Sequence, residues 1–161
     1  RPTIDQMYFR TAMLNAQKPV RLVGADYHGC IKDPHAKSER AEAESAALGC
    51  KGIGNTFKVP FLLLSQIKTA VNDRRNKWPT PSDLLYAGEA ESNICLLIMR
   101  PEHYLSRNEE VDCEEEDKTG IALINVGKNK SGPVGMVRLG YQKNIMYFFD
   151  VVHDPAGNSS F

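Results

Sequence analysis

The sequence lacks the run of about 18 apolar residues that a membrane span needs, and it carries no secretory signal, so we expect neither a membrane segment nor export. Its 4 cysteines stand far apart without a CxxC pair. This usage favours a reduced, cytoplasmic protein over a disulfide framework. The 20 basic and 20 acidic side chains cancel, so any surface for nucleic acid has to be local.

The chain is long enough to bury one sizeable core. Of its 161 residues 42% are apolar, which suits a single domain. We expect this domain to occupy residues 1–153 and residues 154–161 to form a flexible tail. Because the sequence opens at Arg1 without a methionine, we also expect it to be a piece of a longer protein.

The most informative stretch is residues 59–66, an apolar run that ends in Ser65 and Gln66. An unbroken apolar run of this kind suits a central parallel strand that is covered on both faces. In an open parallel sheet, ligands bind at the carboxyl ends of the strands. Gln66, at such an end, is therefore the first candidate for a functional residue.

A second apolar stretch, residues 20–25, predicts a strand that delivers Asp26 to its carboxyl end. Nucleotide hydrolases present a carboxylate to a magnesium ion or its waters in this way. A purely structural alternative stands beside each candidate, since Asp26 would also suit the cap of a turn and Gln66 would also satisfy backbone groups.

Helices are predicted by their capping residues. Thr3 begins a capping-box pattern ahead of an amphipathic helix at 4–17, and Ser38 can cap a helix at about 38–57. Glycines in the later half of this second helix each weaken it by about 1 kcal/mol relative to alanine, so we expect that half to fray.

Ser82 is expected to cap a third, short helix at 83–91, and the other apolar stretches predict strands. A composition rich in glycine, lysine and asparagine predicts a turn at 127–133. Strand–helix units followed by hairpins predict an α/β fold with parallel core strands and antiparallel hairpins at one edge. The later strands are expected at residues 93–99, 121–126, 134–141 and 145–152, the first of them buried.

The loop at 67–81 is basic, with Arg74, Arg75 and Lys77 beside the only tryptophan of the chain. Such a cluster is either an ordinary exposed face or a local contact for nucleic acid, and the tryptophan suits stacking on a base or a subunit contact. The acidic run at 109–117 lacks the spacing of a calcium site and is expected to be a solvated loop.

Four motifs, in order along the chain, resemble the RecA-like motor domain of the replicative hexameric (DnaB-type) DNA helicases. Each motif is weak alone, but their order and distances are specific, and the resemblance covers roughly residues 20–149. The motifs are Asp26-Tyr27 after a strand, Val59-Pro60 leading into Leu64-Ser65-Gln66, Ser82-Asp83-Leu84 with Gly88, and Gly127-Lys128-Asn129-Lys130-Ser131-Gly132-Pro133-Val134-Gly135. The resemblance implies a RecA-like sheet of the P-loop NTPase type.

The resemblance implies catalytic roles for four residues. Asp26 is similar to the Walker B aspartate, which holds Mg²⁺ through water. Gln66 is similar to the residue that senses the γ-phosphate of ATP and passes its state toward the DNA loops. Lys128 and Lys130 lie where this family sends basic side chains to the γ-phosphate of a neighbouring subunit, and a cation there stabilises the charge on the transferring group.

The resemblance also implies the partners. The loop with Arg74, Arg75 and Lys77 and the segment around Gly88 would face single-stranded DNA in the central channel of a ring, where local positive charge suffices. The implied protein is a cytoplasmic homo-hexamer that uses ATP and magnesium and unwinds duplex DNA by translocating on single-stranded DNA. A helicase loader or a primase is an implied further partner.

The chain departs from the family pattern in several places. No GxxxxGK[ST] occurs, so the phosphate-binding loop and the catalytic glutamate are expected upstream, and this chain alone is expected not to hydrolyse ATP. Lys130 stands where the family usually has an arginine finger, and a lysine lacks the bidentate fork. Leu85-Tyr86 replaces an Arg-Glu pair, and His28-Gly29-Cys30 replaces an apolar continuation.

Two alternative functions stay open. One is a non-catalytic RecA-like binding module that docks to a helicase or to DNA, which the altered finger and DNA positions favour. The other is a RecA-like ring ATPase that does not unwind DNA. A zinc site made by His28, Cys30 and His35 lacks the fourth ligand of a structural zinc.

Overall fold

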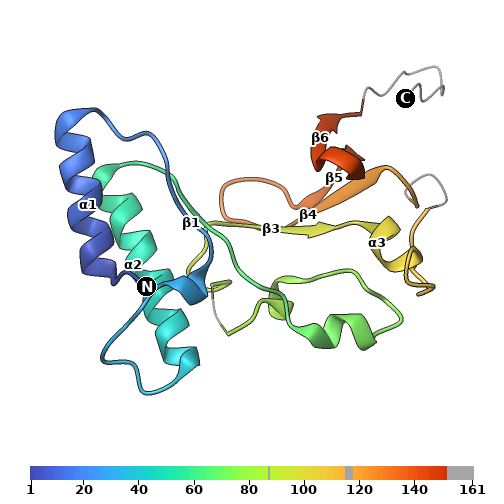
Figure 1. Ribbon diagram of the computed structural model, residues 1–161, viewed down its shortest axis with the longest axis horizontal. Coiled ribbons are helices and arrows are strands. Elements are labelled where there is room, and N and C mark those ends of the chain that lie inside the picture. The colour runs from blue at the N-terminus through green and yellow to red at the C-terminus, as the bar shows by residue number, and fades with distance from the viewer. Residues whose placement is uncertain (87, 115–117, 152–161) are drawn as a thin grey trace. The chain divides into compact units, whose positions relative to one another are not determined.

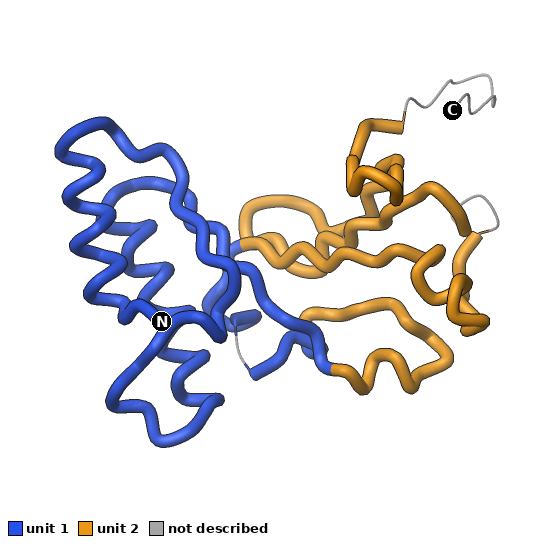
Figure 2. Tube along the Cα trace, viewed as in Figure 1, with its two compact units in different colours: residues 1–68, 82–93 blue, residues 69–81, 94–161 orange. Residues whose placement is uncertain are grey.

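The computed structural model describes residues 1–86, 88–114 and 118–151, and the predicted tail at 154–161 lies outside them. The chain divides into two compact units (Figure 2). The first unit consists of Arg1–Lys68 and Ser82–Asn93, and the second of Thr69–Pro81 and Ile94–Phe161.

Two helices of the first unit begin at the predicted caps. Helix α1 spans Ile4–Gln17, and the Thr3 hydroxyl accepts a hydrogen bond from the Gln6 N–H at 3.3 Å. The Gln6 side chain accepts the Thr3 N–H in return, which completes the capping box. Helix α2 spans Glu39–Phe57 and is capped by Ser38. Figure 1 shows the two helices side by side.

Helix α2 is continuous to Phe57, so the predicted fraying of its later half is wrong. Packing explains the difference, because a Cβ atom on Gly49 would lie 2.5 Å from the Ile4 side chain. A glycine therefore lets α1 approach α2, and the burial gained offsets the low helix propensity. The helix ends at Lys58, whose φ of 56° is left-handed.

The first unit contains a two-stranded parallel sheet, β1 (Val23–Ala25) and β2 (Phe61–Leu63), with Ala25 paired to Leu63. Both strands are shorter than predicted. Hydrogen bonds continue the pairing beyond them, since the Leu64 N–H donates to the Ala25 carbonyl at 3.0 Å. The strands and both helices pack on a small core of Ile4, Met7, Ala25, Ile31, Ala46, Cys50, Phe61 and Leu63.

The predicted helix at 83–91 is absent from the described residues of that stretch. Its first backbone groups pair with another segment instead: Leu84 forms an antiparallel bridge with Ile67, and the Asp83 carbonyl accepts the Lys68 N–H at 2.8 Å. Backbone groups used in this bridge are not available for the hydrogen bonds of a helix.

The second unit contains a four-stranded antiparallel sheet in the order β3-β4-β5-β6 (Figure 1). The hairpins predicted for the end of the chain are confirmed, and with the parallel pair of the first unit they confirm the predicted α/β class. A short helix, α3 (Pro101–Leu105), lies between β3 and β4 and was not predicted. The strands are β3 (Ile94–Met99), β4 (Ile121–Asn129), β5 (Gly135–Gln142) and β6 (Tyr147–Asp150).

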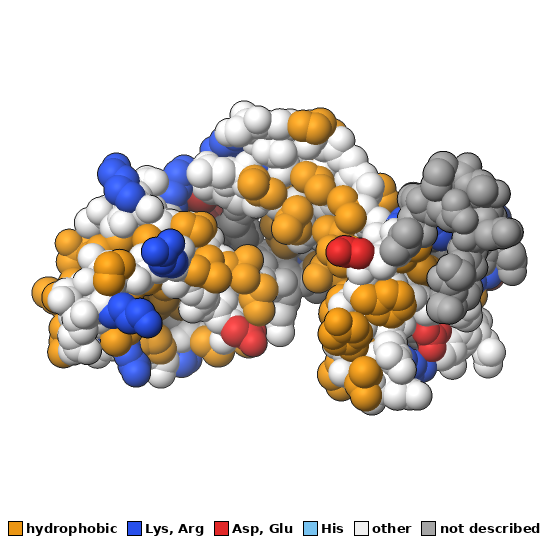
Figure 3. All heavy atoms as spheres, turned by 90° about the horizontal axis from the view of Figure 1, so that it is seen from above, with side chains coloured by type: hydrophobic (Ala, Val, Ile, Leu, Met, Phe, Trp, Pro, Cys, Tyr) orange, Lys and Arg blue, Asp and Glu red, His pale blue; other side chains and the backbone are white. Residues whose placement is uncertain are grey.

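Two strands that were predicted to be buried are covered on one face only. In β3, Cys95, Leu97 and Met99 are buried, whereas the alternating residue Leu96 is 54% exposed. In β2, Leu62 is exposed between two half-buried neighbours. The prediction of full cover is therefore wrong for both strands in this chain. Apolar side chains also reach the surface over much of the face drawn in Figure 3.

Candidate functional site

Asp26 and Gln66 follow the same end of the parallel pair in the first unit. Asp26 comes directly after β1, and Gln66 follows β2 after Leu64 and Ser65. Because β1 and β2 are parallel, both residues leave the sheet at its carboxyl rim. Both side chains are exposed. Both residues therefore follow the strand ends at which the sequence predicted them.

His28 ties the two strand ends together. The chain turns at His28–Cys30 directly after Tyr27, and His28 is buried, with only 6% of the residue exposed. The ring Nδ1 shares a hydrogen bond with the Ser65 hydroxyl at 3.2 Å, and the backbone N–H of His28 donates to the Leu64 carbonyl at 3.0 Å. Burial lowers the pKa of His28, which keeps its ring neutral near pH 7.

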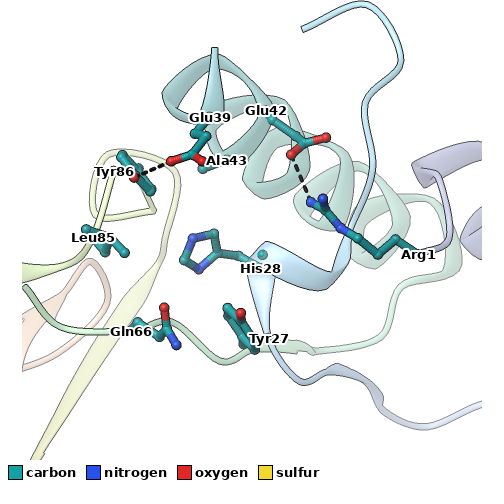
Figure 4. Close-up of a pocket in the computed structure, with 10 residues that line it drawn as sticks. Arg1, Tyr27, His28, Glu39, Glu42, Ala43, Gln66, Leu85 and Tyr86 are labelled. Atoms are coloured by element: carbon teal, nitrogen blue, oxygen red, sulfur yellow. Dashed lines mark hydrogen bonds and ion pairs between the residues drawn. The ribbon is translucent and has the colours of Figure 1, made fainter.

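A pocket of about 260 Å³ opens beside these residues within the first unit (Figure 4). At one wall the Tyr86 hydroxyl donates a hydrogen bond to the Glu39 carboxylate, which raises the pKa of Tyr86. At another wall Arg1 lies 2.8 Å from the Glu42 carboxylate. The lining residues are Arg1, Tyr27, His28, Gly29, Glu39, Glu42, Ala43, Gln66, Leu85 and Tyr86.

Gln66 is also joined to the segment that carries Gly88. The Gln66 carbonyl accepts a hydrogen bond from the Leu85 N–H at 2.8 Å. Nearby, the Lys68 ammonium donates to the Ser82 carbonyl at 2.7 Å. Gly88 has a φ of 121°, and a Cβ there would meet nothing within 4 Å, so backbone conformation rather than space favours glycine.

Residues 69–81 of the basic loop lie in the second unit, where Arg74 and Arg75 are exposed. Lys77 is different, since it is 7% exposed and its ammonium lies 3.0 Å from the Glu109 carboxylate. The same ammonium donates to the Asn72 carbonyl at 2.7 Å. The prediction that Lys77 faces DNA does not fit this burial. Its side chain holds the loop in place instead.

Glu109 belongs to the acidic run that was expected to be a solvated loop. Its bond to Lys77 contradicts that expectation for this residue and lowers the pKa of Glu109. A second bond joins the same two segments, because the Trp78 indole N–H donates to the Asp112 carbonyl at 2.7 Å. Two side chains of the basic loop therefore fix it to the segment that follows α3.

Lys128 and Lys130 lie at the end of β4 in the second unit. The strand runs to Asn129, beyond its predicted end, so Lys128 pairs opposite Cys95 and is half-buried. Lys130 is exposed in the turn that follows. The Asn129 side chain organises that turn by accepting the Ser131 N–H at 3.1 Å and donating to the Pro133 carbonyl at 3.2 Å.

The described residues contain no cluster of three or more His, Cys, Asp or Glu side chains that would hold a metal ion by itself. A single exposed carboxylate such as Asp26 suits magnesium, which keeps several waters and takes few protein ligands. None of the described helices is long and apolar enough to cross a membrane.

Three of these side-chain links were not predicted from the sequence: His28 to Ser65, Tyr86 to Glu39 and Lys77 to Glu109. For the first two a signal existed, because a histidine and a tyrosine stand at positions where the resembling family differs. For the third link no such signal existed, because Lys77 and Glu109 each look like an ordinary surface charge in the sequence.

Solved structures share this arrangement of helices and strands. A DnaB-like replicative helicase, described with its interactions with primase, matches 94% of this chain with a TM-score of 0.82, and the chain covers 35% of it. A separate ATPase domain matches 94% of the chain with the same TM-score of 0.82, and the chain covers 52% of it. Both are 22% identical in sequence, so they show the fold. The fold is therefore RecA-like.

The family follows from the sequence comparison. The model of the DnaB-like helicase C-terminal domain matches residues 1–150, and the chain belongs to this family. The DnaB replicative helicase of Rickettsia felis is 36% identical over 159 residues, which is 91% of this chain and 32% of that protein. The probable replicative helicase of Trieres chinensis is 29% identical over 144 residues, 87% of this chain and 30% of that protein.

These comparisons confirm the resemblance noted from the motifs. The chain spans about a third of the length of the curated relatives it matches.

Proposed function

We propose that this chain is the C-terminal part of an ATP-dependent replicative DNA helicase, which unwinds duplex DNA by translocating on single-stranded DNA. Membership of the DnaB-like family supports the class of protein. The observation that carries the mechanism is the position of Gln66. Its side chain is exposed at the same carboxyl rim of the parallel pair that Asp26 follows, and its backbone carbonyl accepts the Leu85 N–H, three residues before Gly88.

In this proposal the carboxyl rim of the parallel pair faces ATP. The Asp26 carboxylate would hold a magnesium ion through water, and the exposed Gln66 amide would contact the γ-phosphate. Magnesium, when bound, neutralises charge on the phosphate oxygens. A carboxylate and an amide that leave adjacent strands at one rim suit these roles, because the strands fix their spacing.

The two lysines of the second unit act on a neighbouring subunit of a homo-hexamer. The exposed turn supports this role for Lys130, because its ammonium is open to solvent and the Asn129 bonds fix the backbone around it. Lys128 lies two residues earlier, on the end of β4, and shares the role. A cation supplied from a neighbour stabilises negative charge on the transferring phosphoryl group.

Single-stranded DNA is proposed to contact Arg74, Arg75 and the segment around Gly88. Both arginines are exposed, whereas Lys77 anchors their loop through its bond to Glu109. The bond from Leu85 to Gln66 then gives a direct path from the nucleotide to the DNA segment. A cytoplasmic location and a helicase loader or primase as further partners complete the proposal, and one structural relative was described together with primase.

ATP hydrolysis by the full-length protein tests this function. We expect the wild type to hydrolyse ATP with magnesium and the Asp26→Asn variant to lose at least about tenfold in kcat. The Asp5→Asn variant is a matched control, because Asp5 is an exposed aspartate on α1. Equal activity of the Asp26→Asn variant and the wild type would contradict the proposed role.

A non-catalytic binding module is the second candidate. The pair Leu85-Tyr86 favours it, because the Tyr86 hydroxyl is engaged with Glu39 rather than offered to a phosphate. Full-length protein that binds DNA without hydrolysing ATP would support this module. Hydrolysis that is insensitive to single-stranded DNA would instead support a RecA-like ring ATPase of another kind.

A further inference from the structure

We propose that His28 is a positioning residue for Gln66: by holding Ser65, its imidazole fixes the direction in which the neighbouring glutamine is presented at the rim. This inference rests on the proposed function of Gln66 in ATP hydrolysis. It assigns a role to His28, which this chain has in place of the apolar residue expected after Asp26-Tyr27.

The first support is the number of bonds between the two strand ends. The Leu64 N–H donates to the Ala25 carbonyl at 3.0 Å, and the His28 N–H donates to the Leu64 carbonyl at 3.0 Å. A third bond follows one residue farther along the chain, between the His28 Nδ1 and the hydroxyl of Ser65 at 3.2 Å. Ser65 is the residue immediately before Gln66. The residue next to the glutamine is therefore held by a side chain from the segment that follows Asp26.

The second support is the packing of His28 itself. His28 is 6% exposed as a residue, and its ring meets the Tyr27 ring edge-on, with centroids 5.7 Å apart. A Cβ atom on Gly29 would lie 2.5 Å from the Tyr27 ring, so the turn folds tightly against that tyrosine. A buried ring in a tight turn has little freedom, and the atom it bonds is held with it.

The third support is the place of His28 among the pocket residues. Figure 4 shows the imidazole in the space bounded by Tyr27, Gln66 and Leu85. The Gln66 carbonyl is bonded to Leu85 on that side. The backbone of Gln66 is thus held from two directions, through its own bond to Leu85 and through Ser65 before it. Loss of the Ser65 bond would leave the glutamine fixed at one side only.

The test uses the full-length protein and steady-state ATP hydrolysis with magnesium. A His28→Leu variant fills the space without a hydrogen bond, and His28→Asn retains a polar atom near the position of Nδ1. We expect His28→Leu to lower kcat about tenfold with less than about a twofold change in KM, as for an interaction needed in the transition state. We expect His28→Asn to recover most of that loss.

A double-mutant cycle shows whether the effect passes through Ser65. Ser65→Ala should lower kcat to a similar extent, and His28→Leu with Ser65→Ala should be no worse than either single variant. The His35→Leu variant is the matched control, since His35 is exposed in the loop that follows. Thermal unfolding of each variant, measured alongside, separates positioning from a loss of structure.

Three results would overturn the inference. The first is an unchanged kcat in the His28→Leu variant. The second is a double variant in which the two losses of kcat multiply. The third is a His28→Asn variant that loses as much kcat as His28→Leu and has an equally lowered unfolding temperature. A wild-type protein that does not hydrolyse ATP contradicts the proposed function as well. Active wild-type protein with unaffected His28 variants contradicts the inference alone.

Discussion

Lys77 and Glu109 form an ion pair at 3.0 Å in which the lysine side chain is only 8% exposed. The lysine lies in the loop that carries Arg74 and Arg75, and the glutamate lies after α3. The Lys77 ammonium also lies 5.5 Å from the centre of the Tyr104 ring. A residue that looks in the sequence like part of a basic surface is thus the anchor of that surface.

Removal of the anchor should loosen the loop. We expect Lys77→Met to lower the unfolding temperature of the chain, because the buried ammonium bonds two carbonyls as well as Glu109. Trypsin should then cleave faster after Arg74 or Arg75, as seen by mass spectrometry. Lys37→Met, at an exposed lysine of the first unit, is the control. Equal cleavage rates in the two variants would mean that Lys77 does not hold the loop.

The carboxylate of Glu42 should make stability depend on pH. The Asp33 N–H and then Arg1 lower its pKa below the ordinary value of 4.5. A carboxyl group with a depressed folded pKa stabilises the fold above its unfolded pKa, and this contribution is lost as the pH falls through the folded value. We therefore expect the unfolding temperature to decrease as the pH is lowered from about 4.5. In the Glu42→Gln variant this decrease should be smaller. A variant with the slope of the wild type would refute this assignment.

Charge reversal of Arg74 and Arg75 should weaken DNA binding in a salt-dependent manner. The Kd of the full-length protein for single-stranded DNA is measured at several salt concentrations. The slope of the logarithm of the binding constant against the logarithm of the salt concentration should become shallower by about 0.7 for each phosphate that is no longer neutralised. Because Arg74 also donates to the Trp78 carbonyl, Arg75→Glu alone is the cleaner variant. Arg10→Glu, at an exposed residue of α1, is the control. An unaltered slope in Arg75→Glu would exclude this loop from the DNA contact.

Action of Lys130 on a neighbour predicts complementation between two impaired variants. Full-length Lys130→Ala and Asp26→Asn should each hydrolyse ATP at least about tenfold more slowly than wild type. Mixed and reassembled, they should regain activity at interfaces where an intact Asp26 meets an intact Lys130. No recovery in mixed assemblies would indicate that the lysine acts within its own subunit.

The elements that sequence analysis predicted correctly depend on local signals. Thr3 and Ser38 cap helices through bonds to residues three positions away, and short apolar runs mark β1 and β2. The placement of Asp26 and Gln66 followed from strand polarity alone. Such features need no knowledge of distant contacts.

The features that the sequence did not reveal depend on partners far along the chain. Ser82 suits a helix cap, but the residues after it pair with the segment after Gln66. Gly49 weakens a helix in isolation, yet it admits the Ile4 side chain. Lys77 looks like a surface charge until Glu109 is placed beside it.

The link between Gln66 and the DNA segment is tested most directly by ATP hydrolysis of the full-length protein with and without single-stranded DNA. A Gln66→Ala variant should still bind ATP but lose stimulation by DNA, whereas Gln17→Ala, at the exposed end of α1, should keep it. Stimulation of the Gln66→Ala variant equal to that of the wild type would contradict the account.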